Sequence, residues 1–179
     1  MEETSIKAQK AGRWFVFVLV LGGLIWIGRS LLEFPEPRYW NPRTPLDYVA
    51  VVGTSLAFLS LSAVLWGLYR RYPLPTSVKQ KLWLVGMALA ILASAVVGVS
   101  NFIEDALGVN ALGVMFGDGG LSLMLGLLLA TIGAFLHPQI RRRLGRFLLA
   151  CLVGIAFPDS SGGFIVGLAF LILAWMESR

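Results

Sequence analysis

The chain carries little charge for its length, and it has almost none of the side chains on which common metal and cofactor sites depend. Only 14% of its 179 residues are charged, and it has one cysteine, Cys151, and one histidine, His137. A single cysteine cannot form a disulfide within the chain, and a lone histidine has no second histidine or cysteine beside it to hold zinc or haem. We therefore expect no metal and no cofactor.

The sequence motifs of common enzymes are missing as well. The chain has no His-Glu-x-x-His, no Gly-x-Ser-x-Gly, no phosphate-binding P-loop and no Gly-x-Gly-x-x-Gly. No lysine lies inside an apolar run, where it could form a Schiff base. Since no nucleophile is paired with a base, an ordinary enzyme is disfavoured, although outer carboxylates that act on lipid headgroups stay open as an alternative.

Apolar residues dominate instead. They make up 57% of the chain, and the mean hydropathy is +0.77. The net charge of +5 could indicate nucleic acid as a partner, but lysine and arginine form short clusters between apolar runs rather than one basic face. This placement indicates a single integral membrane domain over residues 1–179, with the lipid bilayer as its partner and no nucleic acid.

The apolar runs predict an all-α bundle of six transmembrane helices. They cover residues 14–32, 48–69, 82–103, 119–136, 143–158 and 162–176. The last two runs are short: as one helix, 147–176 would be about 45 Å long, too long for a single crossing. Two crossings are preferred, which makes six helices; one crossing, which makes five, and a hairpin that re-enters on the same side both stay open.

The basic residues predict the orientation. With both termini in the cytoplasm, twelve of the 15 lysine and arginine residues lie on the inner side, and only Arg29, Arg38 and Arg43 lie outside. Such a bias is typical of bacterial cytoplasmic membrane proteins. At the outer end of the first helix, Arg29 is expected to reach the headgroups or to pair with Glu33 one turn later.

A series of small residues stands out in the third apolar run. Gly86, Ala90, Ser94 and Gly98 recur at every fourth position. On a helix, small residues at this spacing form a shallow groove into which a second helix can pack with its backbone. A Gly-x-x-x-Gly pair in the last run, Gly163 and Gly167, is expected to pack within the chain rather than between copies.

Polar residues follow the small ones. Asn101 lies seven positions after Ser94, and Asp105 seven after Gly98, so both continue that side of the helix. Together with Glu104 and Asp118 they form the candidate polar site on the outer side. Such carboxylates can bind a cation or share a proton, but they can equally end a helix in water.

One local pattern carries a resemblance. The run Asn101-Phe102-Ile103-Glu104-Asp105-Ala106-Leu107-Gly108 is followed by a glycine-rich helix, an arginine cluster and two short apolar runs. Over residues 82–176 this order resembles small, uncharacterised multi-pass membrane proteins of bacteria. The resemblance implies six helices and brings no assigned activity.

Two functions are expected from these features. The first is a non-enzymatic membrane component, an accessory subunit or sensor that packs against a partner membrane protein or a second copy of the chain. The second is a small proton- or cation-linked carrier or channel that uses the outer carboxylates. They differ in whether polar groups converge on an interior cavity.

Overall fold

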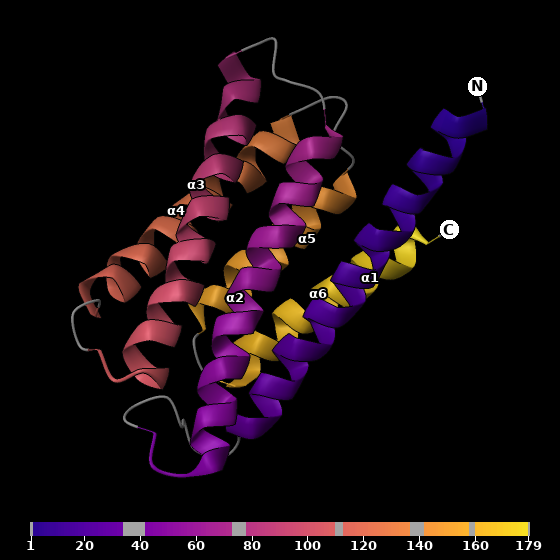
Figure 1. The fold of residues 1–179 in the computed structure, drawn as a ribbon. Helices are drawn as coiled ribbons and strands as arrows, with labels where there is room; N and C mark the ends of the chain where they lie inside the picture. Colours follow the sequence, from indigo (N-terminus) through magenta and orange to yellow (C-terminus); the bar gives the residue numbers. More distant parts are fainter. Residues whose placement is uncertain are drawn as a thin grey trace.

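The chain forms a bundle of six α-helices. The computed structural model describes residues 2–33, 42–72, 78–109, 113–136, 142–157 and 160–178. Within these ranges all the regular structure is helical (Figure 1). The helices are α1 (Glu2–Glu33), α2 (Pro45–Arg71), α3 (Val78–Asn101), a π-helical turn η1 (Phe102–Ala106), α4 (Gly113–Leu136), α5 (Arg142–Ala156) and α6 (Ser160–Glu177). The predicted all-α membrane bundle is confirmed.

Local sequence explains why α2 starts earlier than its uncharged run. The Thr44 hydroxyl accepts a hydrogen bond from the Asp47 amide at 3.3 Å, and the Asp47 carboxylate accepts one from the Thr44 amide at 2.8 Å. Pro45 occupies the first helical position, where no amide proton is needed. This reciprocal cap satisfies the first amides of the helix and moves its start from residue 48 to residue 45.

The helix formed by α3 and η1 ends at a glycine. Gly108 has a φ of 69°, which is the left-handed conformation that glycine adopts without strain. The Val109 amide then donates a hydrogen bond to the Ile103 carbonyl at 3.3 Å and closes the last turn. The next helix, α4, begins at Gly113, before the apolar run at residue 119 from which its start is predicted.

Each helix packs against the next one along the chain, and α6 packs back against α1. The six helices thus form a closed ring, seen in Figure 1 as two layers, with α1, α2 and α3 in front of α6, α5 and α4. Successive helices run in opposite directions. One end of the bundle, here called the α1–α2 end, holds the α1–α2, α3–α4 and α5–α6 connections, and the opposite end, the terminal end, holds both termini.

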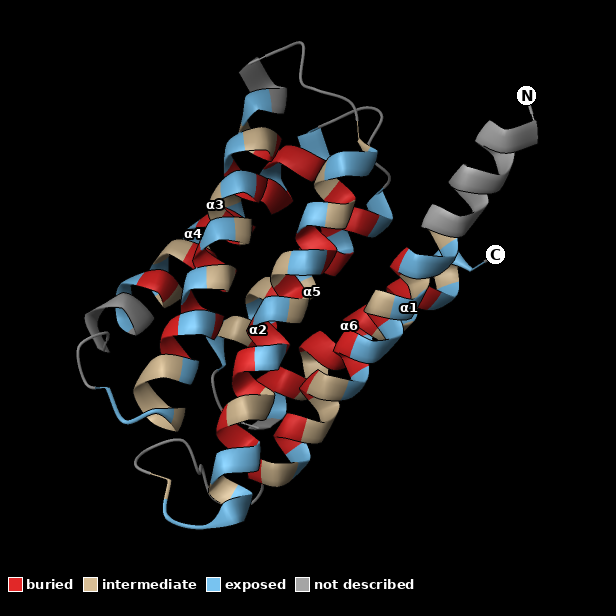
Figure 2. Ribbon diagram, in the orientation of Figure 1, coloured by how far each residue is buried: buried red, intermediate tan, exposed pale blue. Residues whose placement is uncertain are grey.

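Large side chains fill the space inside the ring. Figure 2 shows the buried residues on the faces between helices and the exposed ones on the outer faces. Phe170 on α6 packs against α1 at Gly22, where a built Cβ would lie 2.8 Å from the Phe170 side chain and 3.0 Å from the Ser60 hydroxyl of α2. The largest fully buried side chains are Trp26, Trp83, Phe170, Leu19, Leu61, Leu65, Leu68, Met87, Leu123, Leu127, Leu144 and Leu148.

The small residues of α3 divide between two partners, in place of the single partner expected from their spacing. A Cβ atom built on Gly86 would collide with the backbone of Ala130 on α4, whereas one on Gly98 would lie 3.0 Å from the Ser55 carbonyl oxygen on α2. Positions four apart on an α-helix differ by about 40° in direction, so a series of four turns through about 120°. Gly86 and Ala90 therefore meet α4, and Gly98 meets α2.

Four helices are long and apolar enough to cross a membrane. The candidate spans are Gly12–Glu33, Pro45–Arg71, Lys81–Ala106 and Gly117–Leu136. The apolar helix α6 has 18 residues, but α5 has only 15, and at 1.5 Å per residue it measures about 22 Å against about 30 Å of hydrocarbon. Length and composition thus support four or five spans among the described helices, fewer than the six crossings predicted.

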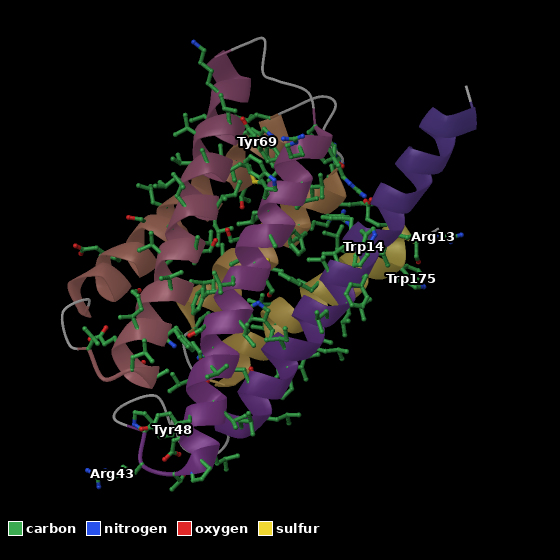
Figure 3. All side chains as sticks on the ribbon, viewed as in Figure 1. Arg13, Trp14, Arg43, Tyr48, Tyr69 and Trp175 are labelled. Carbon is green, nitrogen blue, oxygen red and sulfur yellow. The ribbon has the colours of Figure 1, made fainter. Side chains whose placement is uncertain are left out.

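Exposed aromatic and basic side chains gather toward the two ends of the bundle. Figure 3 shows Tyr48 and Arg43 at the α1–α2 end, with Tyr69, Trp14 and Trp175 toward the terminal end. Trp14 is 68% exposed and Trp175 56% exposed. Tryptophan and tyrosine prefer the interface between membrane and water, so their placement fits helices that cross a bilayer.

Candidate functional site

A buried ion pair lies where α1 meets α2. The Arg29 Nε donates a hydrogen bond to Glu33 Oε1 at 2.8 Å, and the Arg29 and Glu33 side chains are 8% and 1% exposed. The Thr54 hydroxyl on α2 donates to the same Glu33 oxygen at 3.3 Å and also to the Ala50 carbonyl at 3.0 Å. The expected pairing of Arg29 with Glu33 is confirmed, but the pair is buried between helices instead of lying at the headgroups.

The surroundings of Arg29 explain how its charge is tolerated there. Its guanidinium lies 5.6 Å from the ring centre of Trp26, which offers it a cation–π contact. Gly53 on α2 lies beside Arg29, since a Cβ at this position would sit 3.9 Å from the Arg29 Cβ, an ordinary van der Waals distance. A buried charge is costly unless it is paired, so the two side chains depend on each other.

Two polar atoms near this pair lack hydrogen bonds. Glu33 Oε2 and Trp26 Nε1 are both buried, and neither has a partner in the described part of the chain. Trp26 is 1% exposed and packs edge-on against Phe58 of α2, with 5.3 Å between ring centres. A buried polar atom without a hydrogen-bond partner costs about 1–3 kcal/mol. These two atoms therefore leave hydrogen-bonding capacity unused at this junction.

A second polar contact joins α2 to α3. The Asn101 side-chain amide donates to the Ser55 hydroxyl at 2.9 Å and to the Val51 carbonyl at 3.2 Å. Ser55 directly follows Thr54, so two adjacent hydroxyls on α2 form hydrogen bonds with different neighbouring helices. Thr54 faces α1 and Ser55 faces α3, and the buried polar residues therefore extend across all three helices toward the α1–α2 end.

The structure does not bring the predicted outer acids together. Glu104 and Asp105 are half-buried in η1, which packs on α2 and α3, whereas Asp118 is exposed on α4. Asp118 lies inside α4, which starts earlier than the predicted helix at residues 119–136. Among the described residues, no group of three potential ligands is placed to hold a metal ion.

Asn101 of the predicted polar site contacts α2 from the α3 side, whereas the ion pair contacts α2 from the α1 side. Sequence reasoning selected Asn101, Glu104, Asp105 and Asp118 but left out Glu33 and Thr54. The spacing of four residues did predict the pairing of Arg29 with Glu33, but not the contact of Glu33 with Thr54, which the adjacent hydroxyls in the apolar run of α2 could have indicated. Of the other candidates, Cys151 is fully buried, and His137 lies outside the described residues.

A shallow apolar groove lies on the outside of the α1–α2 contact. Its volume is about 410 Å³, and its lining residues are Ile25, Leu32, Tyr48, Val49, Val52, Gly53 and Leu56. The lining has almost no polar surface, which suits acyl chains and not a polar substrate.

Comparison with protein-family models, with curated proteins and with solved structures finds no match for this chain. Its function is therefore argued from its own geometry.

Proposed function

We propose that the protein is a non-enzymatic component of a membrane, an accessory subunit or sensor that acts by packing against another membrane protein or a second copy of itself. The observation that carries this proposal is the filled interior of the helix ring. Trp83, Met87 and Phe170 inside it are at most 1% exposed. A chain whose interior is closed by side chains has its outer helix faces available for interaction.

The charge distribution supports a bacterial cytoplasmic membrane with both termini inside. Most described basic residues lie toward the terminal end, whereas Arg29 and Arg43 (Figure 3) lie toward the α1–α2 end; the former are Arg13, Arg70, Arg71, Lys81, Arg142, Arg143 and Arg146. Of the described acids, Glu177 lies toward the terminal end, and the others lie toward the α1–α2 end; these are Glu33, Asp47, Glu104, Asp105 and Asp118. Positive residues are retained on the cytoplasmic side, which supports a cytoplasmic terminal end.

Mass measurement on the intact protein tests the packing role. The full chain is extracted from its own membrane into native-lipid particles and weighed by native mass spectrometry. We expect a particle that holds a second polypeptide in a fixed ratio, either another copy or a distinct membrane protein. A single chain with lipid alone, at every expression level including the natural one, would contradict the proposal.

A second candidate function, a proton- or cation-linked carrier, is favoured by one observation. Glu33 is 3% exposed and keeps one carboxylate oxygen without a hydrogen bond. Ionisable residues buried in membrane proteins commonly mark ion or proton pathways. The carrier would thus use Glu33, in place of the outer acids Glu104, Asp105 and Asp118.

Flux measurements separate the two functions. Purified protein in liposomes is given a proton, sodium or potassium gradient, and dye or isotope flux is compared with that of empty liposomes. The carrier predicts flux that Glu33→Gln abolishes and that Asp118→Asn, an exposed control, leaves unchanged. Flux equal to that of empty liposomes for all three ions leaves the packing role as the function.

A further inference from the structure

A cluster of basic side chains lies where α5 begins, at the terminal end of the bundle (Figure 1). Arg142, Arg143 and Arg146 are all exposed. Arg146 is four residues after Arg142 and three after Arg143, so it is a neighbour of both on the helix surface. Like charges at these spacings destabilise a helix, and the cluster is therefore unfavourable without a counter-charge.

The face of α5 opposite this cluster is the one that packs inside the protein. A Cβ built on Gly145 would lie 3.0 Å from the Phe135 ring of α4. One built on Gly154 would lie 2.6 Å from the Gly162 carbonyl oxygen of α6. Because the two neighbouring helices cover the buried face of α5, the arginines are on its outer face.

The described part of the chain does not neutralise the three arginines. Within it, none of them forms an ion pair or a side-chain hydrogen bond. The described acid toward the same end, Glu177, is paired with Arg71, with 2.9 Å between Arg71 Nη1 and Glu177 Oε2. The cluster thus presents three positive charges that a ligand can neutralise.

Apolar side chains continue the same face of α5 beyond the arginines. Leu149 is 43% exposed and Val153 37% exposed. At 3.6 residues per turn, positions 142, 146, 149 and 153 point within about 60° of one another. One line along the outside of the helix therefore changes from basic to apolar over roughly 16 Å. A phospholipid is divided in the same order, into a charged phosphate and its acyl chains.

We propose that the outer face of α5 binds an anionic phospholipid, with the phosphate at the three arginines and an acyl chain along Leu149 and Val153. Charge complementarity selects this occupant, because guanidinium groups bind phosphate oxygens in a bidentate manner and anionic lipids attract basic clusters beside membrane helices. A soluble phosphate would leave the apolar part of the face uncovered, whereas a lipid covers both parts. This site goes beyond the packing role and does not depend on it.

The lipids that stay on the protein test the site. The full chain is released by native mass spectrometry from nanodiscs that contain equal amounts of phosphatidylglycerol and phosphatidylethanolamine. Phosphatidylethanolamine has the same phosphate but no net charge, so it is the matched lipid. We expect phosphatidylglycerol to be enriched at least about fivefold among the retained lipids, the factor that one arginine contributes at an anionic surface. The enrichment should be lost in the triple variant Arg142→Gln, Arg143→Gln and Arg146→Gln.

A second triple variant controls for charge at this end of the bundle. It removes the same number of positive charges from exposed residues of α1, α2 and α3 and should keep the enrichment; its changes are Arg13→Gln, Arg70→Gln and Lys81→Gln. Absence of enrichment in the unaltered chain, or equal loss in the two triple variants, would overturn the proposal. A second polypeptide that occupies this face in place of the lipid, and that the α5 variant releases, would also overturn it.

A measurement on the unaltered chain covers the case in which the α5 variant fails to fold. Hydrogen–deuterium exchange is compared between nanodiscs of pure phosphatidylethanolamine and nanodiscs that also contain phosphatidylglycerol. A bound lipid stabilises the helix that it contacts, so segment 143–150 of α5 should exchange at least about threefold more slowly with phosphatidylglycerol present. Segment 82–89 of α3, near the same end, should not change. Equal exchange of segment 143–150 in the two membranes would contradict a site on α5.

Discussion

Asn101 on α3 and Ser55 on α2 are joined by a 2.9 Å hydrogen bond, although 46 residues separate them in the chain. The same Asn101 amide reaches the Val51 carbonyl, so one side chain holds two positions of α2. Lipid cannot replace these two hydrogen bonds. They therefore help to fix the alignment of α2 against α3.

We expect Asn101→Leu to lower the free energy of unfolding by about 1 kcal/mol, the size of an interhelical hydrogen bond in a membrane protein. The matched control is Ser94→Ala, because Ser94 is equally buried but donates only to Ala90 and Ile91 of its own helix. Reversible unfolding in mixed micelles measures both. Equal losses in the two variants would show that the bonds to α2 add nothing.

The buried ion pair gives a prediction with a characteristic sign. Arg29→Met should cost about 3–5 kcal/mol, because it leaves the Glu33 carboxylate buried without its partner. Adding Glu33→Leu to the same chain should recover most of that loss, since the uncompensated charge is then gone. Unfolding free energies of the two single variants and the double variant form the cycle that measures this coupling.

A second ion pair serves as the control for that cycle. Arg71 Nη1 lies 2.9 Å from Glu177 Oε2, but the two side chains are 32% and 26% exposed. Water therefore stabilises the charge that is left behind, and Glu177→Gln should cost less than about 1 kcal/mol. A loss at Glu177→Gln as large as that at Arg29→Met would mean that burial does not set the cost.

The fold could be predicted from the sequence because the helices are marked by long apolar runs. The runs at 48–69 and 82–103 correspond to α2 and α3, and the deviations lie at helix ends where capping decides. The cap formed by Thr44 and Asp47, with Pro45 at the first helical position, extends α2 because it satisfies the first amides of the helix. A hydropathy scale does not detect this effect. The number of membrane crossings could not be predicted as well as the helices. The 15 residues of α5 are enough to form a helix but too few to span the hydrocarbon.

The candidate site was predicted only in part. Asn101 is buried against α2, as its place after the small residues suggests, and Glu33 pairs with Arg29 as expected, but the contact of Glu33 with α2 was not predicted. Its partner Thr54 is 21 residues away, and only the antiparallel packing of α1 on α2 brings them together. Pairing across helices depends on rotation and register, which the spacing within one helix does not determine.

Close approach at Gly86 predicts a strong effect of a single methyl group. Gly86→Ala should lower the free energy of unfolding by about 1–3 kcal/mol, because its Cβ would strike the backbone of Ala130, which cannot rotate away. Gly120→Ala on α4 is the control, since a Cβ there has nothing within 4 Å. That change should be neutral or raise stability by up to about 1 kcal/mol through helix propensity. Similar losses at both positions would contradict backbone contact at Gly86.

The distribution of charge predicts where the termini lie. Both chain ends are at the same end of the bundle, together with Arg71 and Arg146 (Figure 1). A C-terminal green fluorescent protein should therefore fluoresce, and alkaline phosphatase at the same place should be inactive, because basic residues are retained in the cytoplasm. The same reporters inserted after Gly108, at the opposite end of the bundle, should give the reverse pattern. Fluorescence at both positions would mean that α3 and α4 do not cross, and phosphatase activity only at the C-terminus would mean that the bundle is inverted.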